Sequence, residues 1–328
     1  MAKAAVIGAG AWGTTLSILL AEGKHEVMLW SYEPEIIPGI NNLRENKKYL
    51  PGFELLPVIN ATDNLAEALS GAELSIFAVP TQFLGEIIKD SAPRLSPATV
   101  VLSASKGIEE KSLKLPSNII ADCFKGTIAV LSGPNLSKEI ACGLPAATVA
   151  ASKNKDACAF VQKILSSERF RVYTNDDVTG VELGGALKNI IAIAAGVADG
   201  FELGNNAKSA LLIRSMAEIT RLGVSLGAKA QTFAGLSGMG DLITTCSSNL
   251  SRNHYVGFEL AKGRKLAEIM SSMKDVAEGV PTCRAALKLA KKHNVEMPIT
   301  SEVHQVLFED KDPYKAIISL LKRTPTSE

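Results

Sequence analysis

The stretch Ala4-Ala5-Val6-Ile7-Gly8-Ala9-Gly10-Ala11-Trp12-Gly13 decides the fold of this 328-residue chain. Its four apolar residues predict a short buried strand, and Trp12 to Glu22 predicts the helix after the glycines. In such a loop the first glycine permits a tight turn, the second lets a pyrophosphate approach, and the third lets helix and strand pack closely. Backbone N–H groups and the helix dipole then stabilise phosphate charge. Since a second strand, Glu26–Trp30, follows at once, Gly8, Gly10 and Gly13 predict a dinucleotide-binding loop and not a merely structural turn.

Short apolar strands and helices alternate through the first half of the chain. Strands are predicted at Glu26–Trp30, Leu74–Val79, Thr99–Leu102, Thr127–Leu131, Ala147–Ala150 and Arg169–Tyr173, and helices at Gln82–Asp90, Lys155–Ser166 and a segment ending near Ser70 that Thr62 or Asp63 would cap. This alternation predicts an α/β fold, with an N-terminal Rossmann-type, doubly wound parallel sheet.

The pattern becomes helical after Asn175. Long helices are predicted at Asp177–Ala198 and Ala207–Leu222, and further helices begin near Asn253, Lys265, Thr282, Ile299 and Pro313. No alternating strand pattern appears beyond Tyr173. We therefore expect two domains, an NAD(P)-binding Rossmann domain at residues 1–175 and an all-helical C-terminal domain at residues 176–328.

The charge balance and the cysteines exclude several classes of protein. Lysine and arginine total 35 and aspartate and glutamate 34, so no whole-molecule field exists to attract nucleic acid or an anionic membrane. Five separated cysteines without a CxxC pair argue against a zinc site or a disulfide framework, and suit a reducing cytosol. The four histidines have no ligand-like spacing. We expect no metal and no nucleic-acid partner.

Two apolar stretches resemble targeting or membrane segments and are interpreted otherwise. Glycines interrupt the stretch from Ala4 to Ala21, which a signal peptide would not allow. The stretch from Leu183 to Ala198 is shorter than the roughly 18 residues of a membrane span and contains Lys188 and Asn189. The sequence predicts a cytoplasmic protein with no stable membrane insertion.

The end of the second strand bears on the choice between NAD and NADP. An acidic residue there would bind the ribose 2′-hydroxyl of NAD and repel the 2′-phosphate of NADP. Ser31 stands in its place, followed by Tyr32 and Glu33. NADP is therefore not excluded, and a cation from Arg44, Lys47 or Lys48 would favour it if the next loop folds back. Glu33 could act the other way by binding the ribose hydroxyl.

Motifs spread from residue 8 to residue 280 carry a family resemblance. They are Gly8–Gly13, Asn46–Gly52, Ala78–Pro80, Ser105–Ile108, Ser132–Pro134 with Lys138-Glu139, Gly180–Glu182 through Leu187–Asn189, Gly238–Leu242, Ser251–Asn253 and Glu278–Val280. In this order and spacing the chain resembles the bacterial-type NAD(P)-dependent glycerol-3-phosphate dehydrogenases.

The resemblance implies a reversible hydride transfer between NAD(P)H and the C2 carbon that joins dihydroxyacetone phosphate to sn-glycerol 3-phosphate. It further implies a supply of glycerol 3-phosphate for phospholipid synthesis, a helical second domain that binds the substrate, and a homodimer. The chain departs from the family pattern at Ala11, Asn135-Leu136 and Ser137, where other residues are usual. These departures concern the geometry around the nicotinamide and not the reaction.

Lys188 is the main candidate for catalysis. With Asn189 it provides the only polar side chains between Leu183 and Ala198, and small residues surround it. An ordinary lysine here would extend along the apolar surface to solvent. The resemblance instead makes Lys188 the general acid/base, which protonates the alkoxide as hydride reaches the ketone and removes that proton in reverse.

Lys106 and Asp241 are the other catalytic candidates. Lys106 follows a strand at the carboxyl edge of the predicted sheet, where open α/β sheets bind ligands. It is either a surface loop lysine or, by resemblance, a contact to substrate and cofactor. Asp241 could cap a helix that starts at Leu242. The resemblance has it orienting Lys188 or the substrate hydroxyl.

Ser251-Arg252-Asn253 precedes a predicted helix and suits a phosphate, because arginine offers a fork of donors and the helix dipole adds to it. The simpler alternative is Ser251 as an N-cap beside a solvated arginine. By resemblance, substrate contacts also come from Lys106, Gly133, Asn135, Lys188, Asn189, Asp241 and Thr245, and cofactor contacts from Ala11, Trp12, Ser31, Lys106, Ser137, Arg252, Val276 and Glu278. Gly133 could equally form a turn, and Glu278 could be a solvated loop carboxylate.

Two other functions remain open from the sequence. A lysine-dependent β-hydroxyacid dehydrogenase shares this architecture but binds a carboxylate in place of a phosphate. A non-catalytic NAD(P)-sensing regulator could use the same fold. Turnover of a panel of substrates would separate the three.

Overall fold

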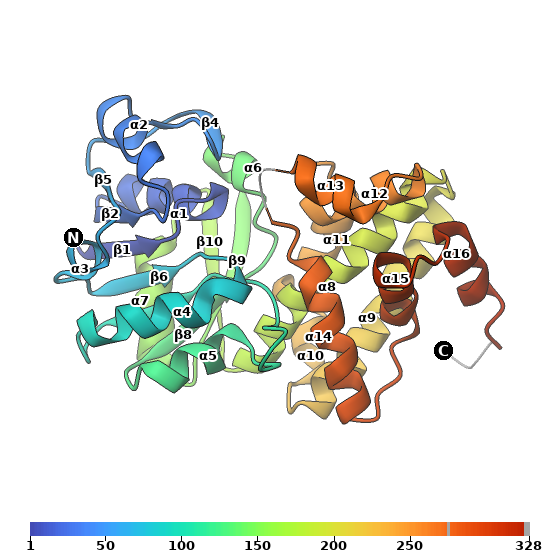
Figure 1. The fold of residues 1–328 in the computed structure, drawn as a ribbon. Helices are drawn as coiled ribbons and strands as arrows, with labels where there is room; N and C mark the ends of the chain where they lie inside the picture. The colour runs from blue at the N-terminus through green and yellow to red at the C-terminus, as the bar shows by residue number, and fades with distance from the viewer. Residues whose placement is uncertain (274–275, 325–328) are drawn as a thin grey trace. The chain divides into compact units, whose positions relative to one another are not determined.

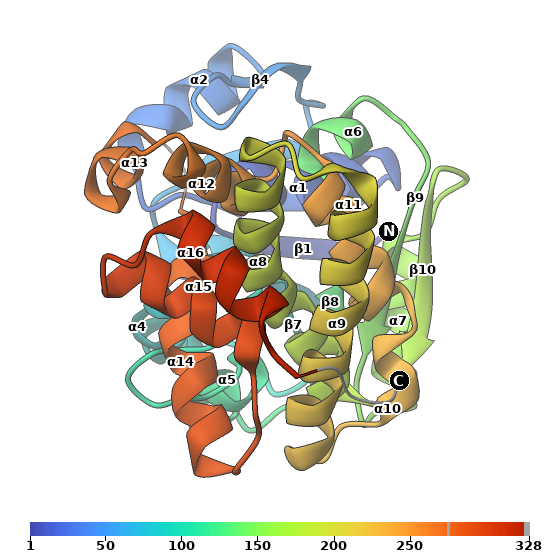
Figure 2. The ribbon, with the colours of Figure 1, turned by 90° about the vertical axis from the view of Figure 1, so that its right-hand side faces the viewer.

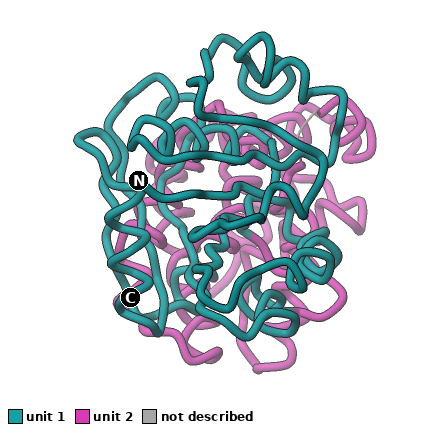
Figure 3. Tube along the Cα trace, turned by 90° about the vertical axis from the view of Figure 1, so that its left-hand side faces the viewer, with its two compact units in different colours: residues 1–106, 114–182 teal, residues 107–113, 183–328 magenta. Residues whose placement is uncertain are grey.

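The computed structural model describes residues 1–273 and 276–324 of the chain. It divides into two compact units (Figures 1 and 3). Met1–Lys106 and Lys114–Glu182 form the first, and Gly107–Leu113 with the residues from Leu183 onward form the second. The domain boundary expected at residue 175 lies at the end of the last strand, while the units change over inside the following helix, and the division into two functional domains stays a prediction.

The first unit is built on an eight-stranded sheet with the order β10-β9-β8-β7-β6-β1-β2-β5. The strands are β1 (Lys3–Ile7), β2 (Glu26–Trp30), β5 (Ile59–Thr62), β6 (Leu74–Phe77), β7 (Val100–Ser103), β8 (Ile128–Ser132), β9 (Ala146–Ala151) and β10 (Phe170–Asn175). From β1 the chain builds outward through β2 to β5, and then returns to β6 on the other side of β1. The reversal beside β1 is a topological switch point, where open sheets of this kind bind ligands.

The Rossmann-type sheet predicted from the sequence is confirmed, with one difference in strand direction. β9 pairs antiparallel with β8 and parallel with β10, whereas the other pairs are parallel. A parallel return from β8 to β9 would need a crossover, usually a helix, that lies across a face of the sheet. The connection here, residues 133–145, contains only the five-residue helix α6 (Ser137–Ala141).

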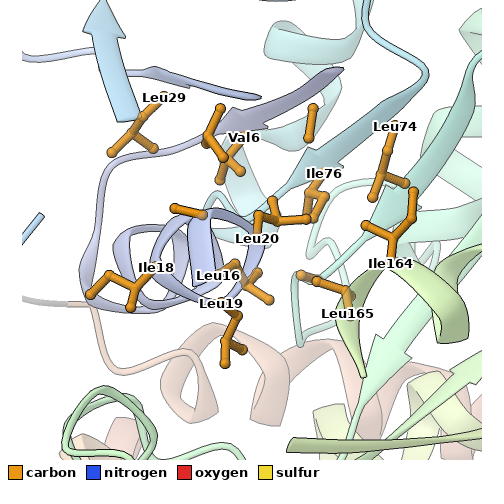
Figure 4. Packing of buried hydrophobic residues seen from close by; sticks show 14 of the residues in the cluster. Val6, Leu16, Ile18, Leu19, Leu20, Leu29, Leu74, Ile76, Ile164 and Leu165 are labelled. Carbon is orange, nitrogen blue, oxygen red and sulfur yellow. The ribbon is translucent and has the colours of Figure 1, made fainter. Parts of the chain in front are cut away.

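Helices cover both faces of the sheet because alternate strand residues point to opposite sides. Ala4 and Val6 of β1 belong to one core, with α1 (Ala11–Glu22) and α7 (Lys155–Leu165), as Figure 4 shows for Val6, Leu16 and Ile164. Ala5 and Ile7 belong to the other core, with α3 (Leu65–Leu69), α4 (Thr81–Ser91) and α5 (Pro116–Cys123). Burial on both faces explains why these strands are continuously apolar in sequence.

Three features of the first unit were not expected. Strand β5 extends the sheet beyond β2, and a small hairpin of β3 (Glu45–Asn46) and β4 (Leu50–Glu54) follows helix α2 (Ile37–Asn42). The cap of α3 is Asn64, whose side chain accepts hydrogen bonds from the backbone of Ala66 and Glu67, and not Thr62 or Asp63. These elements are short and polar on one side, so their sequence pattern is weak.

The second unit is helical in the described residues, as predicted. Its main helices are α8 (Val178–Gly200, which begins in the first unit), α9 (Gly204–Ser225), α10 (Ala230–Phe233), α11 (Asp241–Ser247), α12 (Arg252–Ala261), α13 (Leu266–Ser272), α14 (Gly279–Lys292), α15 (Pro298–Phe308) and α16 (Pro313–Leu321). Helices α14, α15 and α16 pack in succession, as Figure 2 shows in orange and red.

Helix α8 confirms the long helix predicted at Asp177–Ala198. It spans 23 residues and is long and apolar enough, by composition alone, to cross a membrane. However, 94% of its most apolar window is buried inside the protein. This burial is typical of the central core helix of a globular unit, and one such helix is weak evidence for a membrane span.

Candidate active site

The glycine loop at the end of β1 has the geometry that a pyrophosphate needs. Gly8 has a φ of +115°, and a Cβ there would lie 2.7 Å from the carbonyl oxygen of Ala78 beyond β6. A Cβ on Gly13 would lie 1.8 Å from the carbonyl oxygen of Gly8. Around Gly10, by contrast, the space within 4 Å of such a Cβ is open. Two glycines therefore serve the packing of the chain, and Gly10 leaves room for a ligand above the start of α1.

The β3–β4 hairpin is fixed to this loop by one buried side chain. The amide nitrogen of Asn46 donates to the carbonyl oxygen of Ala9 and to the hydroxyl of Thr14, both at 2.8 Å. Asn46 is only 1% exposed. Two hydrogen bonds from a buried amide hold the hairpin against the first turn of α1, and hence place Lys48 and Tyr49 near the end of β2.

At the end of β2 the structure changes the role expected for Ser31. The Ser31 hydroxyl donates to the backbone oxygen of Glu33 and accepts from its nitrogen, and Ser31 is 2% exposed. The carboxylate of Glu33 accepts from Lys48 Nζ at 2.7 Å and from the Tyr49 hydroxyl at 2.8 Å. Burial opposes ionisation, but the hydrogen bonds outweigh it and hold the pKa of Glu33 below its ordinary value. Ser31 thus shapes a turn that presents Glu33.

The remaining candidates of the first unit gather around the end of β8. Lys106 Nζ donates to the carbonyl oxygen of Gly133 at 2.8 Å. A Cβ on Gly133 would lie 2.8 Å from Thr148 Cα, so close packing against β9 explains this glycine better than a turn does. The amide of Asn135 donates to the Thr148 hydroxyl, and its buried carbonyl oxygen has no hydrogen-bond partner within the described residues. Ser137, at the start of α6, accepts from the Thr15 hydroxyl through its backbone oxygen. Lys106 is therefore not a solvated loop lysine.

In the second unit Lys188 is buried, with 6% of its surface exposed. Its ammonium lies 2.5 Å from Asp241 Oδ1 and 2.5 Å from the Thr245 hydroxyl oxygen. Thr245 also donates to Asp241 Oδ1 at 3.2 Å. The interpretation of Lys188 as a lysine reaching solvent is therefore wrong, and the three side chains form one buried polar cluster. A buried ion pair persists only when its charges are matched and hydrogen-bonded, as they are here.

Small residues bring this cluster together. A Cβ on Gly184 would lie 2.5 Å from the carbonyl oxygen of Ser237, so α8 touches the wide helical turn at Leu236–Gly240 one turn before Lys188. That turn leads directly into α11. Asp241 is the first residue of α11, with Gly240 as the N-cap, so the alternative that Asp241 caps a helix is wrong. Its side chain instead points to α8.

A second polar network links the starts of α12 and α14 to α8. Asn253 donates to Asn189 Oδ1 at 3.0 Å and accepts from the backbone nitrogen of Gly279 at 2.9 Å. Ser251 is the N-cap of α12, its hydroxyl accepting from the His254 nitrogen, while Arg252 is exposed at the first turn. The N-cap alternative for Ser251 is thus correct and is compatible with an anion at the same helix end.

The last two cofactor candidates precede α14. Val276 is 37% exposed, and Glu278 is half-buried at the N-cap position of that helix. Glu278 is therefore not a solvated loop carboxylate. No group of three or more metal-ligating side chains that could hold an ion occurs among residues 1–273 and 276–324.

Comparison with known proteins agrees with this geometry over the whole chain. Residues 3–158 match the family model for the N-terminus of NAD-dependent glycerol-3-phosphate dehydrogenase, and residues 177–318 match the model for its C-terminus. The chain belongs to this family.

Proteins named as glycerol-3-phosphate dehydrogenases match this chain over nearly its full length. A protein of Geobacter sulfurreducens named glycerol-3-phosphate dehydrogenase [NAD(P)+] is 46% identical over 98% of both chains. One of Bacillus velezensis with the same name is also 46% identical, over 100% of this chain and 96% of its own. The crystal structure of glycerol-3-phosphate dehydrogenase from Coxiella burnetii has a TM-score of 0.95 at 38% identity and covers 98% of this chain and 99% of its own. A ketopantoate reductase of Ralstonia eutropha, at 17% identity and a TM-score of 0.61, shares the fold alone.

Some positioning residues of this family member had no sequence signal. His254 is 5% exposed and its Nε2 lies 2.7 Å from Asp199 Oδ2, which also accepts from Lys208 at 2.6 Å. These contacts join α12 to α8 and α9. The residues that make these contacts lie far apart in sequence, and none of them belongs to a quoted motif. Asn46, which positions the glycine loop, differs because it lies in the motif Asn46–Gly52.

Proposed function

We propose that this chain reduces dihydroxyacetone phosphate to sn-glycerol 3-phosphate with NAD(P)H, and catalyses the reverse reaction, with Lys188 as the general acid/base. The family match over both halves of the chain establishes the reaction class. The observation that supports the assignment of residues is the buried contact of Lys188 with Asp241 and Thr245. Bound NAD(P)H supplies the hydride to the carbonyl carbon of the substrate.

Lys188 is the group that moves the proton in this proposal. Its Nζ donates a proton to the carbonyl oxygen of the substrate as that oxygen becomes an alkoxide, and takes the proton back in the oxidation direction. Asp241 holds the ammonium in place, and Thr245 accepts one of its three N–H donors. Lys106, bonded to Gly133, is proposed as a further contact to substrate and cofactor.

The phosphate of the substrate is proposed to bind at the start of α12. Arg252 is exposed in the first turn of that helix, and Asn253 is fixed by Asn189 and Gly279. A helix N-terminus with an arginine stabilises a phosphate through charge-assisted hydrogen bonds. The alternative β-hydroxyacid substrates would bring a carboxylate to this point in place of the phosphate, so the family match is what favours the phosphate.

The fit of a dinucleotide is supported by the open space above Gly10 and by the buried indole N–H of Trp12, which has no hydrogen-bond partner among the described residues. We assign cofactor binding to residues 1–175, through Gly8, Gly10, Ala11, Trp12, Gly13, Lys106 and Ser137, and place substrate binding and catalysis in residues 176–328. Arg252, Val276 and Glu278 are proposed as cofactor contacts from the helical part.

A homodimer is also part of the proposal. The second unit has an apolar cavity of about 830 Å³ between α8, α9, α15 and α16. Leu321 lines it and is 75% exposed, and Tyr314 on α16 is 51% exposed. We propose that a second copy of the chain covers this apolar surface, because contiguous exposed apolar surface marks an interaction site. Sedimentation of wild type and Leu321→Glu tests this: we expect a dimer that the charge weakens, and a monomeric wild type would contradict it.

We further propose a cytoplasmic enzyme that supplies glycerol 3-phosphate for phospholipid synthesis. The function itself is tested by following NADH and NADPH oxidation with dihydroxyacetone phosphate, with unphosphorylated dihydroxyacetone and with a three-carbon β-keto acid. We expect turnover with the phosphorylated ketone, much less with dihydroxyacetone and none with the acid. Preference for the acid would favour the β-hydroxyacid dehydrogenase alternative, and absence of any turnover would favour the non-catalytic sensor.

A further inference from the structure

A carboxylate, that of Glu33, lies close to the end of β2 in this chain, although no acidic residue follows that strand directly. Ser31 is buried, and its hydroxyl forms hydrogen bonds with the backbone oxygen and nitrogen of Glu33. The turn that results brings the side chain of Glu33 back to the hairpin residues Lys48 and Tyr49. Glu33 keeps 29% of its side chain exposed, so its oxygens can still accept a hydrogen bond from a ligand.

The charges around this point sum to a negative value. Lys48 lies 2.7 Å from Glu33 and 3.5 Å from Glu35, so that one ammonium is shared by two carboxylates. The three groups together carry a charge of −1. A ribose hydroxyl can donate to such a site, whereas a 2′-phosphate must approach a net negative charge and compete with Glu33 for Lys48.

The other cations of the loop do not reverse this balance. Arg44 donates to the carbonyl oxygen of Ile59 at 2.8 Å, and Ile59 pairs with Val27 near the beginning of β2. Ser31 lies four residues further along, or roughly 13 Å at the rise of a strand, which is beyond one Debye length at physiological salt. Lys47 is 69% exposed and lies 3.9 Å from Glu45. Lys48 is therefore the loop cation placed at the end of β2, and it is already shared.

We propose that Glu33, positioned by Ser31, Lys48 and Tyr49, binds the ribose 2′-hydroxyl and makes this enzyme prefer NADH to NADPH. The inference rests on the proposed function only in that the same site binds the cofactor. Because the carboxylate is partly exposed and partly neutralised, the preference is one of degree, on the order of tenfold. NADPH is still accepted.

Equilibrium binding of NADH and NADPH to the full-length protein tests the proposal without relying on turnover. Dissociation constants are measured by fluorescence titration for wild type, Glu33→Gln, Lys48→Met and Glu45→Gln, with the thermal midpoint recorded for each. Glu45 is the matched control, since it is a carboxylate paired with a lysine on the same hairpin. We expect wild type to bind NADH about tenfold more tightly than NADPH. The ratio of the dissociation constant of NADPH to that of NADH should fall at least fivefold in Glu33→Gln and rise in Lys48→Met. It should be unchanged in Glu45→Gln.

Two results would overturn the proposal. One is a wild type that binds NADPH as tightly as NADH or more tightly, with Lys48→Met abolishing NADPH binding, because Lys48 would then be a phosphate ligand. The other is an unchanged ratio in Glu33→Gln. A separate turnover assay with dihydroxyacetone phosphate tests the proposed reaction. If turnover is absent, the proposed function fails, while the binding ratios still test the cofactor preference.

Discussion

Lys188 illustrates how a charged residue is kept inside the second unit. Moving an ammonium out of water costs several kcal/mol, which the Asp241 carboxylate and the Thr245 hydroxyl offset at 2.5 Å each. Gly184 makes this possible, since a side chain there would collide with Ser237 and separate α8 from the turn before Asp241. The sequence showed the lysine and the small residues around it, but not which acid would reach it.

Gly10 provides a prediction at the same scale. Gly10→Val should fold with a loss of at most about 1 kcal/mol, because its backbone is extended and the space around a Cβ is open. The same side chain would occupy the space of the pyrophosphate. NADH at a hundredfold excess over its Kd should therefore stabilise wild type by about 2.7 kcal/mol and leave the stability of Gly10→Val unchanged. Thermal unfolding with and without NADH measures this difference.

Gly13 is the control for that experiment. Gly13→Ala places a Cβ 1.8 Å from the Gly8 oxygen and should lower the free energy of unfolding by roughly 3 kcal/mol even without cofactor. If Gly10→Val is stabilised by NADH as strongly as wild type, the loop does not bind the dinucleotide as assigned.

Arg252 carries the prediction for the substrate phosphate. Arg252→Ala should weaken the binding of dihydroxyacetone phosphate by roughly ten- to a hundredfold, since a charge-assisted hydrogen bond contributes about 1.5–3 kcal/mol. Dihydroxyacetone, which has no phosphate, should be almost unaffected. Steady-state KM values for both ketones measure this difference, and equal losses for the two would show that Arg252 only supports α12.

At the scale of elements, two buried glutamates accept hydrogen bonds from the first turns of helices that lie far from them in sequence. Glu182 of α8 accepts from the nitrogen and hydroxyl of Ser117, at 2.8 and 2.5 Å, in the first turn of α5. Glu218 of α9 does the same for Ile299 and Thr300 at the start of α15. Burial raises the pKa of both carboxyl groups, that of Glu182 to about 7, although the hydrogen bonds oppose the shift.

The raised pKa of Glu182 predicts a pH dependence of stability. The folded state holds this proton more tightly than the unfolded state, so the contribution is complete below pH 4.5 and is lost as the pH rises towards and through 7. The loss amounts to about 3 kcal/mol for a shift of this size. Urea unfolding of wild type and Glu182→Gln between pH 4.5 and 8 should show wild type losing about that much relative to the variant. Parallel profiles would contradict the burial of an ionisable Glu182.

The elements predicted correctly are those with a strong local pattern. β1, β2, β6, β7, β8 and β9 are mainly buried apolar runs, β10 begins with alternating buried and exposed residues, and the helices of the second unit have amphipathic or apolar patterns of adequate length. β5 was missed because it is short and lies at the edge of the sheet, and the β3–β4 hairpin was missed because its strands are short and form a separate two-stranded sheet. The direction of β9 was missed because strand polarity depends on the crossover and not on the strand's own residues.

At the scale of the whole molecule, the net charge of +1 and the family match agree with a small-molecule enzyme that binds anions at local sites. Each unit supplies its own anion site in our account, the glycine loop in the first and the start of α12 in the second. The identity of the candidate residues could be predicted from motifs. The hydrogen bonds that position them, such as Asn46 on Ala9 and His254 on Asp199, join residues far apart in sequence and required the structure.

The central claim is that Lys188 transfers the proton in the reduction of dihydroxyacetone phosphate, and one comparison of wild type with Lys188→Ala tests it most directly. NADH oxidation is followed at saturating dihydroxyacetone phosphate, with NADH binding and thermal unfolding measured on the same samples. We predict that wild type turns over and that Lys188→Ala binds NADH normally while kcat falls by at least ~100-fold, the usual scale of general acid/base catalysis. Near-normal kcat in a folded, NADH-binding Lys188→Ala would contradict the account.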